Sequence, residues 1–163
     1  MNLEDDILYL KEACNYAMKN STDNSTKNCA IIINDNKIIS IGVNEFPFNV
    51  KETKERWQKP KKYSYVEHAE RNAIYNAAKH GRIINNSTMF CPWYACDNCA
   101  RAIIQSGIKR VVGLKSLKDK TYNQWKESVD LALEMLSEAD VITDFIDFKL
   151  GINLRFNNED ILI

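Results

Sequence analysis

Apolar residues recur along this chain with two spacings, and each spacing predicts a different kind of element. From residue 3 to residue 20 they return every three or four positions, which is typical of an amphipathic helix. Residues 29–33 and 37–41 are instead β-branched runs on either side of a polar stretch, and this favours a hairpin. The polar segment 20–26 predicts a loop between the helix and the hairpin.

The second half of the chain alternates between the two patterns. Helices are predicted over residues 69–79, 99–106 and 121–139, and strands over 87–91, 108–113 and from residue 141 onward. Such alternation implies an α/β domain with helices layered on a mixed sheet. Residues 143–163 mix apolar and charged positions, so an added strand, a terminal helix and a subunit contact all stay open.

Length and composition bound the class of protein. With 163 residues and no internal repeat, the chain is expected to form a single domain over residues 1–163. Its zero formal net charge argues against a polynucleotide partner. No apolar run approaches the roughly 18 residues that span a membrane, so no membrane partner is expected. Five cysteines without a signal-peptide pattern predict a reducing, cytoplasmic location.

Two short motifs carry the candidate chemistry, one around His68 and the other around Cys96 and Cys99. Imidazole and thiolate are ligands that zinc prefers, and a catalytic zinc takes three protein ligands while one position stays open. We therefore predict a Zn²⁺ site made by His68, Cys96 and Cys99. Cysteines three apart share a helix face, and the positive end of a helix dipole favours their thiolate form.

Glu70 is the predicted catalytic residue. The pattern H-x-E followed by P-C-x-x-C is the signature of zinc-dependent nucleobase deaminases, in which the Glu moves protons and does not bind the metal. This chain matches except that Ala95 stands in place of the Pro. Because proline presets the backbone that enters a helix, the change affects local rigidity more than chemistry. His68 and Glu70, only two apart, are expected at a helix start.

A structural zinc is the alternative for this site. It would need a fourth protein ligand, and the remaining candidates do not fall in a second metal-binding spacing; they are Cys14, Cys29, His80 and Cys91. The motif therefore favours an open site beside a carboxylate. A zinc-stabilised binding module without catalysis is kept as a different class of function.

A basic segment precedes the His68 motif. Residues 51–62 hold six basic and two acidic side chains, a local net charge of +4 in a neutral chain. Cationic groups bind phosphate, so we predict that Arg56, Lys61 and Lys62 contact the phosphate of a substrate. The alternative is a solvated surface loop.

The chain resembles the cytidine and deoxycytidylate deaminase superfamily, and within it the dCMP deaminases, from about residue 26 to residue 142. The residues that carry the likeness are Asn44, the tract 62–74 with its His68-Ala69-Glu70 motif, Cys96 to Cys99, and the tract 104–109. The resemblance implies a three-layer α/β/α fold with a mixed five-stranded sheet. It also implies a homo-oligomer.

By the same resemblance the activity is zinc-dependent hydrolytic deamination of dCMP to dUMP and ammonia, with a small-molecule nucleotide as the partner. Asn44 and Ala69 correspond to substrate contacts, and Tyr122 lies where the family often has an aromatic near the base. A turn role for Asn44 and a packing role for Tyr122 are the alternatives. The glycine-rich loop that follows the asparagine in regulated members is absent at residues 45–49, which argues against control by dCTP and dTTP.

Other deaminase substrates stay open. They include another free base, nucleoside or nucleotide, such as dCTP, cytidine or a purine, and a base in tRNA or another nucleic acid. An editing enzyme must track a polynucleotide backbone. Outside residues 51–62 the chain carries a net charge of −4, which disfavours that function.

Overall fold

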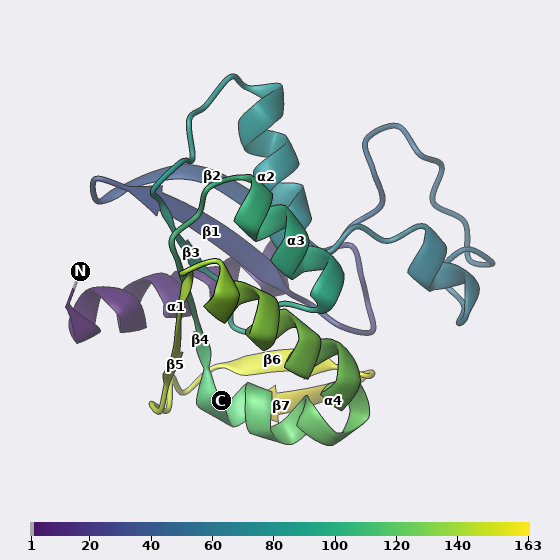
Figure 1. Ribbon diagram of the computed structural model, residues 1–163. Coiled ribbons are helices and arrows are strands. Elements are labelled where there is room, and N and C mark those ends of the chain that lie inside the picture. The colour runs from purple at the N-terminus through teal and green to yellow at the C-terminus, as the bar shows by residue number, and fades with distance from the viewer. Residues whose placement is uncertain (1) are drawn as a thin grey trace.

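The computed structural model describes residues 2–163 and is built around one mixed sheet (Figure 1). The strand order is β2-β1-β3-β4-β5; β1 pairs antiparallel with β2 and β3, whereas β4 runs parallel to β3 and β5. The strands are β1 (Cys29–Asn34), β2 (Lys37–Val43), β3 (Thr88–Phe90), β4 (Arg110–Leu114) and β5 (Ile142–Ile146). The predicted mixed five-stranded sheet is confirmed.

Helices cover both faces of the sheet, which gives the predicted three layers (Figure 1). Helix α1 (Leu3–Asn20) packs on one face through Leu10 and Ala13. Helices α2 (Ala69–Lys79), α3 (Asp97–Gln105) and α4 (Lys115–Glu138) contribute to the core on the other face. Within residues 2–163, no helix combines the length and the apolar character needed to cross a membrane.

The hairpin between β1 and β2 forms where the sequence predicts it. Asp35 and Asn36 occupy the turn with φ values of 48° and 58°. A two-residue turn with both residues in the left-handed region matches the twist of the adjoining strands. Asn and Asp tolerate that region better than other residues with a side chain.

An ion pair connects α1 to the far strands of the sheet. The Arg110 guanidinium donates to both carboxylate oxygens of Asp6, at 2.8 and 2.6 Å, and through Nε to Asp144 at 2.7 Å. Asp6 is only 3% exposed, and the ion pair with Arg110 replaces contacts with water that its side chain has lost. The hydrogen bonds to Asp6 raise the pKa of Arg110, which keeps the guanidinium charged.

The C-terminal residues form a second small sheet. Strands β6 (Asn153–Phe156) and β7 (Glu159–Leu162) pair as an antiparallel hairpin that is separate from the five-stranded sheet. Leu154 is fully buried, and the Phe156 ring lies 4.8 Å from the Trp93 ring. At the hairpin tip, Asn158 N donates to Ser25 O at 3.0 Å. Of the tail 143–163, residues 143–146 thus complete β5 of the main sheet, whereas β6 and β7 form a separate hairpin.

Helix α4 differs from the prediction, because it begins at Lys115 and not at residue 121. The added segment 115–120 contains three lysines and only one buried apolar residue, Leu117, so apolar spacing does not indicate a helix there. The helix also bends at Trp125, whose φ and ψ of −121° and 18° are not helical. The bend divides α4 into two segments with different directions.

Helix α2 lies unusually close to the sheet at Gly42 of β2. A Cβ atom on Gly42 would stand 2.1 Å from Ala73 N and 2.5 Å from Ala69 O. These neighbours are backbone atoms of α2, so they cannot move aside as a flexible side chain would. Glycine at this position is therefore a steric requirement.

We expect Gly42→Ala to lower the free energy of unfolding by about 3 kcal/mol or more, at the upper end of overpacking effects, because the added methyl overlaps the α2 backbone. Denaturant titration of the parent and the variant measures this change. Gly81→Asn is the control: Gly81 has φ 64° with open space around it, and Asn tolerates that conformation. Equal stability of Gly42→Ala and the parent would contradict the close approach.

Candidate active site

Three potential metal ligands meet where two helices begin. His68 is the N-cap residue of α2, and Cys96 is the N-cap residue of α3, while Cys99 lies in the first turn of α3. One ligand atom from each of the three residues lies within 4.8 Å of the other two. The predicted convergence of two helix N-termini is therefore confirmed.

The distances fit a tetrahedral zinc. His68 Nδ1 lies 3.5 Å from the Sγ atoms of both Cys96 and Cys99. With ordinary Zn–N and Zn–S bonds, two ligands of a tetrahedral site stand about 3.5–3.8 Å apart. The donor set and these two distances are thus compatible with a tetrahedral Zn²⁺.

No fourth protein ligand joins this group among residues 2–163. Cys14, Cys29 and Cys91 are fully buried in the core, and burial raises the pKa of each of these thiols. His80 is at the opposite end of α2 from His68, where its Nδ1 lies 2.7 Å from Asn76 O. The arrangement leaves one position of a tetrahedron for a ligand from solution, unlike a closed structural site.

The two thiols share their ionisation. Hydrogen bonds from Cys99 and from His68 lower the pKa of Cys96 to about 4, whereas donation to Cys96, together with burial, raises the pKa of Cys99. Burial opposes protonation of His68, but the hydrogen bond to Cys96 and the charge of Glu70 raise its pKa on balance. A thiolate beside an imidazole and a second thiol is the donor chemistry that zinc selects.

Glu70 lies in the first turn of α2, two residues after His68, and is only 2% exposed. Its Oε2 is buried without a hydrogen-bond partner in the described chain. Burial raises the pKa of this carboxyl group. A buried carboxylate oxygen without a partner is costly, so its presence beside three metal ligands indicates a group that awaits a ligand.

Asn44 holds the start of α2. Its Oδ1 accepts a hydrogen bond from Ala69 N at 3.0 Å, and its Nδ2 donates to Thr26 O at 3.2 Å. The contact therefore brings Asn44 to the residue that stands between His68 and Glu70 in the chain. Among residues 2–163, one amide hydrogen and one oxygen lone pair of Asn44 have no hydrogen-bond partner.

Arg71 was not predicted as a site residue, although it directly follows Glu70 in the first turn of α2. It forms an ion pair with Glu67 four residues earlier, and both side chains are about one-fifth exposed. Burial opposes ionisation of Arg71, but the neighbouring cysteine pair and the hydrogen bond to Glu67 raise its pKa on balance, so the guanidinium adds positive potential near the thiols. The i,i+4 spacing of opposite charges could have indicated the pair from sequence.

The basic segment belongs to an arm, residues 45–66, that extends to one side of the sheet (Figure 1). Arg56 Nη1 donates to Lys51 O at 2.7 Å, and its guanidinium lies 4.6 Å from the centre of the Tyr65 ring. Lys61 is exposed and begins the short 3₁₀-helix η1 (Lys61–Ser64). These two cations are accessible from solution.

The structure corrects the prediction for Lys62. Its side chain is 8% exposed, and its Nζ lies 2.6 Å from Asp23 Oδ2 and 2.5 Å from Ser25 Oγ. A lysine so occupied joins the arm to the loop before β1 and does not offer a cation to a phosphate. The charge pattern alone could not reveal this, because Asp23 is 39 residues away.

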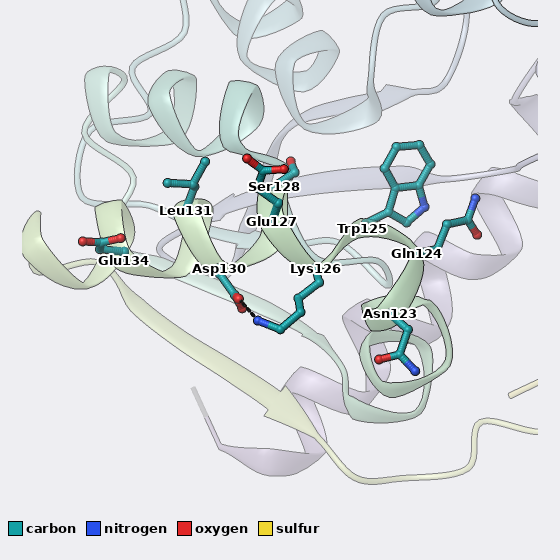
Figure 2. Close-up of a pocket in the computed structure, with 9 residues that line it drawn as sticks. All are labelled: Asn123, Gln124, Trp125, Lys126, Glu127, Ser128, Asp130, Leu131 and Glu134. Carbon is teal, nitrogen blue, oxygen red and sulfur yellow. Dashed lines mark hydrogen bonds and ion pairs between the residues drawn. The ribbon is translucent and has the colours of Figure 1, made fainter.

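Tyr122 lies on α4, and its hydroxyl donates to Asp130 at 2.7 Å. Within residues 2–163, no hydrogen bond joins it to the metal group. The same helix borders an open cavity of about 700 Å³ at the bend, where the Trp125 ring meets Tyr63 of the arm edge-on at 6.4 Å. Figure 2 shows the lining side chains, which all belong to α4 and are Asn123, Gln124, Trp125, Lys126, Glu127, Ser128, Asp130, Leu131 and Glu134.

Comparison with known proteins gives relatives for this arrangement. The model of the cytidine and deoxycytidylate deaminase zinc-binding region matches residues 3–115. A probable deoxycytidylate deaminase of Caenorhabditis elegans is 32% identical over 128 residues, which cover 76% of this chain and 64% of the relative. The match thus spans less than two thirds of the nematode protein. An uncharacterised deaminase from the luxG 3′ region of Aliivibrio fischeri is 33% identical, with 74% of this chain and 80% of the relative covered.

A solved structure supports the same fold. The dCMP deaminase of cyanophage S-TIM5, in complex with dCMP and dUMP, superimposes with a TM-score of 0.67 at 23% sequence identity, covering 90% of this chain and 99% of the phage protein. The family match covers most of the chain and includes all three metal-ligand positions. The chain therefore belongs to the cytidine and deoxycytidylate deaminase zinc-binding family.

Proposed function

We propose that the protein catalyses zinc-dependent hydrolytic deamination of dCMP to dUMP and ammonia. One observation carries this proposal: the ligand atoms of His68, Cys96 and Cys99 lie within 4.8 Å of one another, beside the buried Glu70 carboxylate with its unpaired oxygen. A non-catalytic zinc module would not need that carboxylate. We assign His68, Cys96 and Cys99 as the zinc ligands and Glu70 as the catalytic acid and base.

Zinc bound here would act as a Lewis acid that lowers the pKa of water toward neutrality. Glu70 accepts one proton from the attacking water as the water oxygen adds to C4 of cytosine, and delivers that proton to N3. It then takes the remaining proton from the new C4 hydroxyl and delivers it to the departing amino group, which leaves a C4 carbonyl. The C4–N4 bond breaks and ammonia leaves. The raised pKa of Glu70 suits this exchange, since a carboxyl group that both accepts and returns protons works best near the operating pH.

The substrate assignment rests on the relatives and on the polar groups around the site. The nematode relative is named a probable deoxycytidylate deaminase, and the phage protein of the same fold binds dCMP and dUMP. We propose that Asn44 and the backbone of Ala69 contact the nucleoside, and that Arg56 and Lys61 contact its phosphate. Tyr122 is kept as a candidate contact near the base.

The wider setting is also a proposal. We propose one domain over residues 1–163, a homo-oligomeric state as in the resembling family, and a cytoplasmic location. The five free cysteines support a reducing compartment.

Glu70→Gln is expected to lower kcat by about 10²–10⁴-fold, because the amide keeps the shape of the side chain but cannot shuttle protons. Ammonia release from dCMP measures the rate, and metal analysis of the same sample is the control, with zinc expected at the parental level. A kcat within tenfold of the parent would falsify the acid–base role.

Cys96→Ala is expected to remove most of the zinc, because a site with three protein ligands loses one of its two thiolates. Atomic absorption on purified protein gives the stoichiometry. Cys91→Ala serves as the matched control, since Cys91 is buried but lies outside the ligand group. Full zinc in the Cys96 variant would contradict the ligand assignment.

Replacing Arg56 and Lys61 together by Ala is expected to raise the KM for dCMP about tenfold, with little change for deoxycytidine, because only the nucleotide carries a phosphate. Steady-state kinetics on both compounds test this selectivity. Lys54→Ala, at an exposed lysine of the same arm, is the control for a general loss of charge. An equal effect on both substrates would rule out a phosphate contact.

A further inference from the structure

We propose that Ser128 of α4 is a positioning residue for the metal site, because it holds the segment that carries Cys96 and Cys99. The inference rests on the zinc site of the proposed function. It concerns a residue that lies outside both sequence motifs and touches neither a ligand atom nor Glu70 in the described chain.

Ser128 makes two hydrogen bonds to one residue of the cysteine segment. Its Oγ accepts from Asp97 N at 3.1 Å and donates to Asp97 Oδ1 at 2.6 Å. Asp97 directly follows Cys96 and stands two residues before Cys99. The pair of bonds therefore fixes both the backbone and the side chain of the first of the two residues between the cysteines.

These bonds also supply the capping hydrogen bond that the N-cap residue of α3 does not make. A helix leaves its first N–H groups without intrahelical partners, and an N-cap side chain usually satisfies one of them. The N-cap residue here is Cys96, whose side chain makes no such bond because its sulfur faces the metal group. Ser128 provides the hydrogen bond from another helix, so Cys96 can serve as a ligand while the helix start stays satisfied.

The rest of the Asp97 side chain is held as well. Its Oδ2 accepts from Arg101 Nη1 at 3.3 Å, and Arg101 Nη2 donates to Asn98 Oδ1 at 2.5 Å. Arg101 is more than half exposed, so its contribution is screened by solvent. Ser128 is partly buried at the contact between α3 and α4, which makes it the more rigid of the two partners.

The bend in α4 determines where Ser128 lies. Trp125, the non-helical residue, precedes Ser128 by three positions, so Ser128 stands in the first turn of the second segment of α4. Figure 2 shows Ser128 away from the solvent-exposed ion pair of Lys126 and Asp130 on the same helix. After Ser128, Val129 and Ala132 are buried and continue the inward face.

Ala95, which stands where the deaminase signature has proline, explains why the contact between Ser128 and Asp97 matters here. The deaminase signature has a proline immediately before the first cysteine, and proline restricts the backbone there. Alanine does not restrict the backbone in this way, and no backbone hydrogen bond in residues 2–163 uses the Ala95 N–H. The Ser128–Asp97 pair restores order to the segment one residue after Cys96, from outside the motif.

The test is zinc affinity, measured on purified protein by competition with a chromophoric chelator. Ser128→Ala removes both hydrogen bonds without adding bulk, and it should weaken zinc binding roughly tenfold, the lower end of the effect seen for groups that orient metal ligands. Ser128→Thr keeps the hydroxyl and should retain affinity close to the parent. Ser137→Ala, at an exposed serine of α4 without a side-chain hydrogen bond, is the matched control.

The thermal midpoint of the metal-free proteins is measured beside zinc affinity. It should fall by a few degrees for Ser128→Ala relative to Ser137→Ala, because the start of α3 loses its capping hydrogen bond. Zinc affinity is therefore compared well below both midpoints, where each variant is folded. Zinc affinity of Ser128→Ala within twofold of the parent, or an equal loss in Ser137→Ala, would overturn the proposal. A parent chain that binds no zinc would instead remove the metal site itself, and with it the proposed function.

Discussion

The structure depends on one geometric constraint, which is that two helices must begin at the same point. Three metal ligands can lie within 4.8 Å of one another only if α2 and α3 bring their N-termini together. The sheet makes this possible, because β3 and β4 run parallel and α3 connects them, while α2 follows the antiparallel hairpin of β1 and β2. The positive ends of both helix dipoles then act on the same few atoms and favour the thiolate form.

Local sequence patterns were sufficient for those parts of the molecule whose partners are near in the chain. The bounds of α1 follow from apolar spacing, those of α2 follow from a run of good helix formers, and the hairpin turn at Asp35 and Asn36 follows from residues that accept left-handed backbone. The grouping of His68 with Cys96 and Cys99 was also predictable, because ligand chemistry restricts which residues can meet. The metal-ligand group is therefore the part of the site that local sequence indicates.

The supporting contacts could not be predicted, since each joins residues that are far apart in sequence. Lys62 pairs with Asp23 across 39 positions, Arg110 with Asp6 across 104, and Ser128 with Asp97 across 31. Charge pattern alone assigned Lys62 to a phosphate, because an ion pair and a free cation look the same in a linear sequence. The C-terminal hairpin has a similar cause: its position depends on Trp93 and on the loop at Ser25, not on its own periodicity.

Gly42 links the packing of the fold to the position of the proposed site. Since position 42 carries no side chain, the first turns of α2 rest directly on the backbone of β2, with Ala69 and Ala73 fully buried at the contact. Ala69 stands between His68 and Glu70 in the chain, so this contact also fixes how far the helix turn that carries both residues lies from the sheet. A larger residue at position 42 would push that turn outward and displace a metal ligand and the proposed catalytic group together, although its own nearest neighbours would be Ala69, Asn72 and Ala73.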